Sequence, residues 1–162
     1  MKFRIIPRLE IKNNFLIKGM RMEGLKKIGN PIQFAKKYSD NNYHEILFED
    51  VVATLYERKI DIDLLRQVSN NINIPLIVAG GIKSINDIET LLKNGADKVC
   101  INSAAVRDPK LITEASKIFG SQCIGIIAQF KMIDDKYEIF LESGRERVFK
   151  DLLKWVKEAE DR

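Results

Sequence analysis

The amino-acid sequence predicts an α/β fold with a parallel sheet. Short apolar runs alternate with longer segments in which apolar residues recur every three or four positions, the spacing of an amphipathic helix. This strand-helix alternation continues along the chain, as in parallel sheets whose strands are joined by helical crossovers. Several apolar runs also end on glycine or on a polar residue, and α/β folds place their functional sites at the carboxyl ends of such strands.

The first predicted strand is residues 4–11, and it carries Glu10 close to its carboxyl end. The segment that follows, Asn13–Asn30, is long and interrupted by glycines. It is therefore predicted as an irregular loop, of the kind that often covers a functional site. The pair Asn30 and Pro31 then supplies the cap and the first position of a helix.

The second predicted strand is residues 45–50, and it places another carboxylate, Asp50, at its carboxyl end. A second helix is predicted over residues 61–71, where leucine, valine and isoleucine recur at helical spacing. The repeated placement of carboxylates at strand ends indicates polar chemistry at one edge of the sheet.

The third and fourth apolar runs carry the clearest functional signal. The third ends on Gly80 and Gly81, and the fourth ends on Asn102 and Ser103. The helix between them begins at Ser84, a typical cap. Glycines let a ligand approach the backbone N–H groups, and the two polar side chains add donors, so this edge is predicted to hold half of a phosphate site. The alternative is that the glycines only form a tight turn.

The last part of the chain is predicted to add one more strand between two helices, and a small hairpin. The fourth helix begins at Pro109 and ends at Gly120, and the fifth strand covers residues 124–129. Apolar residues two apart predict an antiparallel hairpin over residues 131–144, and a final helix is predicted over residues 148–160. The predicted buried face of that helix consists of Phe149, Leu152, Leu153 and Val156.

Composition limits the possible functions. The chain has 162 residues, enough for one domain with a substantial core, and its 45% apolar and 31% charged residues are ordinary for a globular protein. No stretch is apolar enough for a membrane span, so a cytoplasmic location without a membrane partner is expected. The net charge of +4 is mild and dispersed, which disfavours a nucleic-acid partner. One histidine and two cysteines without metal spacing predict neither a metal site nor a cofactor.

Seven segments together resemble the cyclase subunit of imidazole glycerol phosphate synthase, the HisF family. They are residues 4–12, 16–19, 29–31, 45–50, 79–82, 95–105 and 119–122. The resemblance implies a TIM (β/α)8 barrel, an architecture of about 250 residues. This chain would be its N-terminal portion, a single domain of five consecutive β/α units with a small hairpin after strand five. The alternative is a rearranged, flavodoxin-like doubly wound sheet, since five strands suffice for an open sheet but cannot close a barrel.

The resemblance also implies a reaction, in which ammonia and phosphoribulosyl formimino aminoimidazole carboxamide ribonucleotide give imidazole glycerol phosphate. Two aspartates serve the family as acid and base, at the ends of strands one and five. Glu10 matches the first and keeps a carboxylate on a longer arm. Gln129 matches the second and cannot exchange protons, so turnover by this chain alone is expected to be very low or absent.

Other residues match the family's binding groups. The residues that match one of its two phosphate sites are Gly80, Gly81, Asn102 and Ser103. The second phosphate site comes from strands seven and eight, which the resemblance does not cover. Lys18 matches the lysine of a mobile loop over the active site, and Asp50 matches a strand-end carboxylate near the substrate.

The implied partners follow from the same resemblance. Arg4, Glu45 and Lys98 match three of the four charges around the barrel floor, where ammonia from a glutaminase subunit enters. A second chain carrying strands six to eight, or a homo-oligomer, would complete the barrel around a phosphorylated sugar or ribonucleotide.

Two other functions remain open at this stage. Residues 7–8 and 20–25 resemble the branch found in surface-polysaccharide gene clusters, where barrel and glutaminase together aminate a sugar. The chain could instead be a non-catalytic barrel remnant that binds a phosphate or a protein partner.

Overall fold

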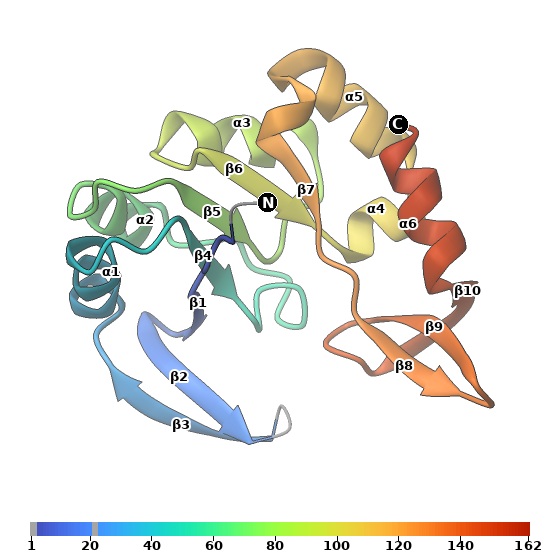
Figure 1. Ribbon diagram of the computed structural model, residues 1–162, viewed down its shortest axis with the longest axis horizontal. Coiled ribbons are helices and arrows are strands. Elements are labelled where there is room, and N and C mark those ends of the chain that lie inside the picture. The colour runs from blue at the N-terminus through green and yellow to red at the C-terminus, as the bar shows by residue number, and fades with distance from the viewer. Residues whose placement is uncertain (1–2, 21–22) are drawn as a thin grey trace.

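The computed structural model describes residues 3–20 and 23–162, and its main sheet contains five parallel strands in chain order (Figure 1). The parallel strands are β1 (Arg8–Lys12), β4 (Ile46–Asp50), β5 (Leu76–Ala79), β6 (Lys98–Ile101) and β7 (Ile124–Ile126). The predicted α/β fold with a parallel sheet is therefore confirmed. A flavodoxin-like sheet would place the first parallel strand between the second and the third, so that alternative is wrong. Within the described residues the sheet has open edges at β3 (Glu23–Gly29) and β7, and it does not close into a barrel.

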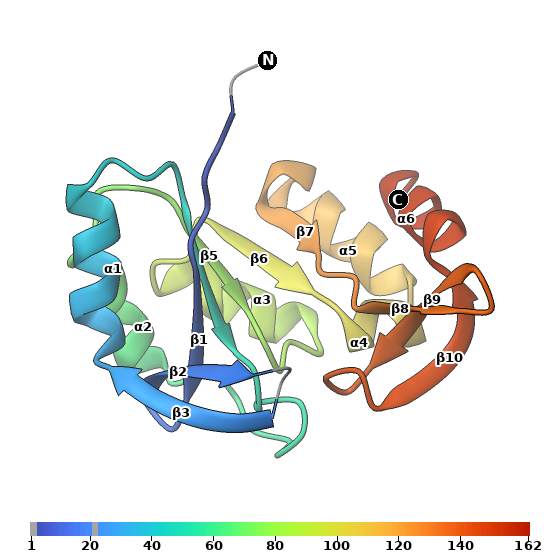
Figure 2. The ribbon, with the colours of Figure 1, turned by 60° about the horizontal axis from the view of Figure 1, so that its bottom comes forward.

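Helices connect successive parallel strands and lie along one face of the sheet (Figures 1 and 2). They are α1 (Pro31–Asp40), α2 (Ile62–Ser69), α3 (Ile85–Lys93) and α5 (Lys110–Phe119). The side chains of Asn30, Asp61 and Ser84 accept hydrogen bonds from N–H groups in the first turns of α1, α2 and α3. The predicted starts of these helices are confirmed. None of the helices in the described ranges is long and apolar enough to span a membrane.

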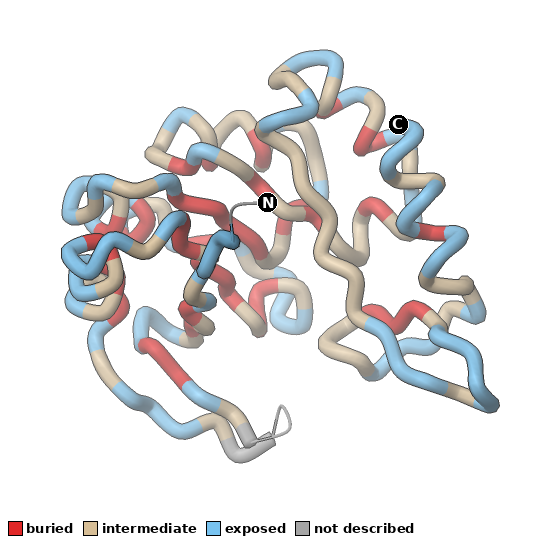
Figure 3. Tube along the Cα trace, viewed as in Figure 1, coloured by how far each residue is buried: buried red, intermediate tan, exposed pale blue. Residues whose placement is uncertain are grey.

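The two faces of the parallel sheet differ in chemistry, because successive residues of a strand point to opposite faces. The row that faces the helices consists of Leu9, Phe48, Val78 and Val99, each at most 2% exposed. The next row, on the opposite face, consists of Glu10, Glu49, Ala79 and Cys100. The core therefore lies between sheet and helices, where most of the buried chain runs (Figure 3).

Residues 15–20 and 23–29 form two antiparallel strands, so the predicted irregular loop is wrong. Strand β2 (Phe15–Met20) pairs antiparallel with both β1 and β3. Leu16 and Ile17 are buried, and the register shifts between β2 and β3 accommodate the irregular sequence. The first parallel strand is also shorter than the predicted range 4–11. Residues 21 and 22, within the segment likened to the surface-polysaccharide branch, lie outside the described residues.

The C-terminal part forms a second, three-stranded sheet followed by a helix. Its strands are β8 (Phe130–Ile133), β9 (Lys136–Leu141) and β10 (Glu146–Asp151), so the predicted hairpin is confirmed and has one more strand. The last helix, α6 (Leu152–Glu160), begins later than predicted because Asp151 accepts a hydrogen bond from Lys154 N–H as its cap. Two short helices, α4 (Ser103–Arg107) and the 3₁₀ turn η1 (Ser121–Cys123), were not predicted.

Of the four residues in the predicted apolar face of the last helix, Leu152 packs against the core, and the other three are largely exposed. Phe149 precedes the helix and is 76% exposed, and Leu153 is 72% exposed. The residue that α6 buries completely is Trp155, together with the partly buried Leu152. The helix packs on β9 and β10, and the side that contains Leu153 is mostly exposed.

Candidate functional site

A cavity of about 290 Å³ lies at the carboxyl ends of the parallel strands. The sequence-predicted residues that line it are Asp50, Gly80, Gly81, Asn102, Ser103 and Gln129. They come from separate segments, which the sheet brings together because parallel strands end at the same edge. We call this the strand-end cavity. Sequence reasoning missed four charged residues of its lining, which are Glu49, Lys83, Arg107 and Glu142.

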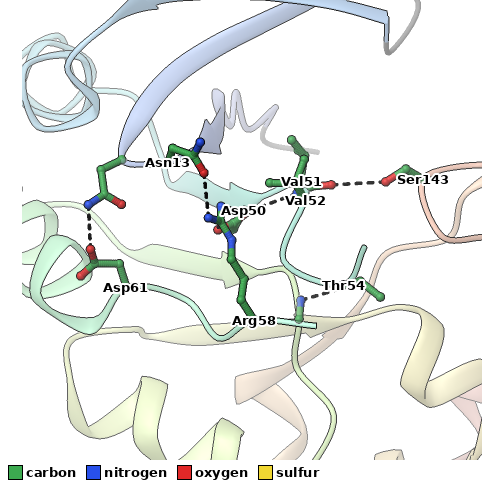
Figure 4. A network of polar contacts seen from close by, with 10 residues as sticks. Asn13, Asp50, Val51, Val52, Thr54, Arg58, Asp61 and Ser143 are labelled. Atoms are coloured by element: carbon green, nitrogen blue, oxygen red, sulfur yellow. Dashed lines mark hydrogen bonds and ion pairs between the residues drawn. The ribbon is translucent and has the colours of Figure 1, made fainter. Parts of the chain in front are cut away.

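Asp50 is held by its own loop rather than aimed freely at the cavity (Figure 4). Its Oδ1 accepts from Val52 N–H at 3.1 Å, and Arg58 Nη2 donates to Oδ1 and Oδ2 at 3.2 and 2.8 Å. Arg58 also donates to Asn13 Oδ1 at 2.8 Å, which ties the β1–β2 turn to this loop. The structure thus gives Asp50 an ion-pair and capping role at the cavity wall.

Gly80 and Gly81 have positive φ values of 107° and 66°, which side chains rarely adopt. A Cβ on Gly80 would collide with the carbonyl oxygen of Asp50. The Gly81 N–H already donates to Thr54 Oγ1 at 3.3 Å. The glycines are therefore required by close backbone packing, and Asn102 and Ser103 add side-chain donors for an anion.

Three buried oxygens in the lining accept no hydrogen bond from any described residue. They are Asn102 Oδ1 and Gln129 Oε1, together with Glu49 Oε2, which forms an ion pair with Arg8 Nε at 2.8 Å but has no aligned hydrogen bond. Buried polar atoms are nearly always bonded, so such a group of acceptors indicates a site for a polar ligand. Gln129 lies beyond the end of β7, in the segment that leads to β8, rather than on the predicted strand.

Arg107 joins helix α4, beside the cavity, to the second sheet through two ion pairs. From α4 its Nη2 donates to Glu142 Oε1 at 3.0 Å and to Glu146 Oε2 at 2.6 Å. On the other side Ser143 Oγ donates to the carbonyl oxygen of Val51 at 3.3 Å (Figure 4). The second sheet therefore forms part of the cavity wall.

An ion-pair cluster lies at the opposite, amino ends of the strands. Glu45 is 4% exposed, and its carboxylate contacts Arg4 Nη1 at 2.5 Å and Lys98 Nζ at 3.1 Å. These three residues were singled out together from the sequence, and the fold brings them into contact.

Comparison with known proteins identifies the family. A family model described as "Histidine biosynthesis protein" matches residues 4–162. The chain belongs to this family. Its curated relatives include imidazole glycerol phosphate synthase subunit HisF from Flavobacterium psychrophilum, 48% identical over 159 residues, and that from Campylobacter concisus, 42% identical over 159 residues. Each alignment covers 98% of this chain and 63% of the relative. The chain thus spans less than two thirds of the length of these relatives.

Two other residues matched to the histidine biosynthesis family do not line the strand-end cavity. Glu10 faces the same side of the sheet as Glu49, and its Oε1 lies 3.3 Å from Arg8 Nη2. Lys18 is exposed on β2, opposite Lys26 of β3. The sequence placed Glu10 on a strand but Lys18 in a loop, and only the hairpin pairing set the direction in which Lys18 lies.

Cys100 lines the cavity, but its environment suppresses thiolate chemistry. Burial, with a smaller contribution from the nearby Glu49, raises the pKa of Cys100 to about 11. Neither cysteine forms a disulfide, and the described residues contain no group of three His, Cys, Asp or Glu side chains that could hold a metal.

We expect Cys100 to react slowly with iodoacetamide. At pH 8 only about one such thiol in a thousand is deprotonated, so alkylation should be roughly tenfold or more slower than that of free cysteine. The Cys123→Ser variant leaves Cys100 as the sole thiol, and mass spectrometry follows its labelling. The denatured variant is the control. Equal rates for folded and denatured protein would contradict the expectation.

Proposed function

We propose that this chain is the N-terminal portion of a HisF-like (β/α)8 barrel and serves as the cyclase part of an enzyme of the imidazole glycerol phosphate synthase type. Five parallel strands in chain order with helices on one face correspond to the first units of such a barrel. A second chain, or another copy of this one, supplies the strands that pair with the open edge at β7. Phe3 and Ile5, just before β1, are exposed apolar side chains that such a partner would cover.

The substrate is a phosphorylated ribonucleotide or sugar bound in the strand-end cavity. The observation that carries this proposal is the convergence of the strand-end groups on one cavity with unbonded polar atoms. Asn102 and Ser103 offer donors to a phosphate, and Lys83, which also lines the cavity, favours an anion. Glu10 and Gln129 stand at the positions of the family's acid and base, and Lys18 at that of its mobile-loop lysine.

A glutaminase subunit of the HisH type is the proposed ammonia source. It would dock at the amino ends of the strands, where Arg4, Glu45 and Lys98 form one cluster. The buried Glu45 between two cations fits a gate for a small polar molecule, because each of its bonds to a cation can be exchanged for one to ammonia.

We expect ribose 5-phosphate to bind saturably and to shift the amide NMR signals of residues 102–104. Replacing Ser103 with alanine removes one hydrogen bond to a charged group, so the dissociation constant should rise about tenfold. Ser121→Ala, at an exposed serine outside the cavity, is the control and should leave the constant unchanged.

The enzymatic part is tested by supplying ¹⁵N-ammonia with the ribonucleotide substrate and following label in imidazole glycerol phosphate. Binding without label, in the presence of the glutaminase and of a chain carrying the remaining strands, would favour a non-catalytic phosphate-binding protein. If ribose 5-phosphate causes no saturable shift of the amide signals near Ser103, the proposed phosphate site is wrong.

A further inference from the structure

Glu49 is a charged residue in the middle of the parallel sheet, and neither the sequence motifs nor the family match assigned it a role. It lies on β4, on the face without helices, in register with Glu10 of β1 and Ala79 of β5. It is 7% exposed and lines the strand-end cavity together with Gln129. An ionised carboxylate is costly at such a depth unless it is well paired, so its surroundings decide its state.

The pairing of Glu49 is incomplete. Arg8 Nε lies 2.8 Å from Glu49 Oε2, and Arg8 Nη2 lies 3.3 Å from Glu10 Oε1, so one guanidinium stands between two carboxylates. Even so, Oε2 accepts no aligned hydrogen bond from any described residue. One positive charge shared by two carboxylates leaves this pair of acids with a net negative charge if both ionise.

The other charged groups around Glu49 do not neutralise the remaining negative charge of Glu49 and Glu10. On its own strand, the negative charge of Asp50 is taken up by Arg58. On β6, Lys98 is engaged by Glu45, and Cys100 is a neutral thiol. Strand β5 (Leu76–Ala79), which pairs with β4, carries no titratable side chain. Burial is the largest cause that raises the pKa of Glu49, Glu10 and Asp50 raise it further, and Arg8 opposes them.

We propose that Glu49 holds the exchangeable proton of the strand-end cavity, the role that Gln129 cannot fill, and that Arg8 positions it beside Glu10. The inference rests on the proposed function for its substrate. When the ammonia nitrogen bonds to a substrate carbon and the bond from that carbon to the leaving nitrogen breaks, the Glu49 carboxyl gives its proton to the leaving nitrogen. The resulting Glu49 carboxylate takes the proton that the newly bonded nitrogen loses, which restores the carboxyl group. Glu10, outside the cavity lining, contributes a negative charge that raises the pKa of Glu49.

Carboxyl ¹³C NMR of the full chain between pH 3 and 9 tests the proton directly. One glutamate signal, absent in Glu49→Gln, should titrate above the ordinary value of about 4.3. Glu10→Gln should lower that midpoint by removing a negative neighbour, and Arg8→Ala should raise it. The inference is overturned if the Glu49 signal titrates at or below the ordinary value, or if its midpoint is the same in Glu10→Gln as in wild type. Glu89→Gln, on the exposed side of α3, is the matched control and should change nothing.

Stability against pH supplies a measurement that needs no substrate. A raised pKa in the folded state means that the contribution of Glu49 is fully present below its unfolded pKa and is lost as pH rises through the folded pKa. Wild type should therefore lose stability relative to Glu49→Gln over that window. Parallel curves for the two proteins would count against the inference, since all other groups are common to both.

Turnover supplies the catalytic readout. In the ammonia assay with all components present, Glu49→Gln should lower kcat about 10²- to 10⁴-fold with little change in KM, and Glu49→Asp should restore part of it. The wild-type profile should fall on the alkaline side as Glu49 ionises. If wild type itself shows no turnover, the proposed function fails. The NMR titration of Glu49 then decides by itself whether Glu49 holds the exchangeable proton. Unchanged kcat in Glu49→Gln beside an active wild type overturns the inference.

Discussion

Replacing Trp155 with alanine is expected to lower the free energy of unfolding by about 3–5 kcal/mol. Trp155 is fully buried in α6 and belongs to the same core cluster as Ile139 and Leu141 of β9. Lys150 Nζ also lies 4.2 Å from the centre of its ring. Removing the indole therefore opens a large void between the last helix and the second sheet. Denaturant unfolding followed by circular dichroism measures the loss.

The control for this prediction is Leu153→Ala on the same helix. Leu153 is 72% exposed, so its truncation should change the free energy of unfolding by less than about 0.5 kcal/mol. Amphipathic spacing alone predicts the reverse, with Leu153 buried. A larger effect at Leu153 than at Trp155 would mean that α6 packs by its other side.

Replacing Gly80 with alanine should destabilise the protein by about 2–4 kcal/mol and abolish ribose 5-phosphate binding. The added Cβ meets the backbone carbonyl of Asp50, which cannot move without breaking the contact with Arg58, and φ is +107°. Both strain and displacement fall on the wall of the strand-end cavity. Thermal unfolding and the phosphate titration measure the two effects on one sample.

Gly144→Ala separates strain from collision. Gly144 also has a positive φ, +82°, but the nearest atom to its added Cβ would be Lys131 Cε at 3.6 Å, an ordinary contact. Gly144→Ala should lower the free energy of unfolding by about 1 kcal/mol and should retain phosphate binding. If the two variants lose the same free energy of unfolding, the collision with the Asp50 carbonyl does not contribute to the destabilisation by Gly80→Ala.

Helix starts and strand ends could be predicted from sequence because they depend on local chemistry. Asn30 and Ser84 accept hydrogen bonds from N–H groups of the turns that they precede, whatever the rest of the chain does. Gly80 and Ser103 likewise follow apolar runs that can only be strands in an α/β pattern. Their meeting in one cavity follows from parallel pairing alone.

The antiparallel pair of β2 and β3 could not be predicted in this way. Its strands contain glycines and irregular spacing, and they are stabilised by pairing with β1, a partner that local sequence does not reveal. The face of α6 was missed for a related reason, because Trp155 and Leu153 are both apolar and only the position of β9 and β10 selects between them.

The sequence by itself determined the order of the parallel strands and of the longer helices between them, the caps, and the polar residues at the strand ends, since these follow from hydrogen bonding and periodicity within a few residues. Only the tertiary structure decided that Asp50 is bound by Arg58 and that Glu49 stands beside Arg8 and Glu10. The physical reason is that the charge state of a carboxyl group depends on burial and on neighbours from other strands, and sheet pairing brings those neighbours together.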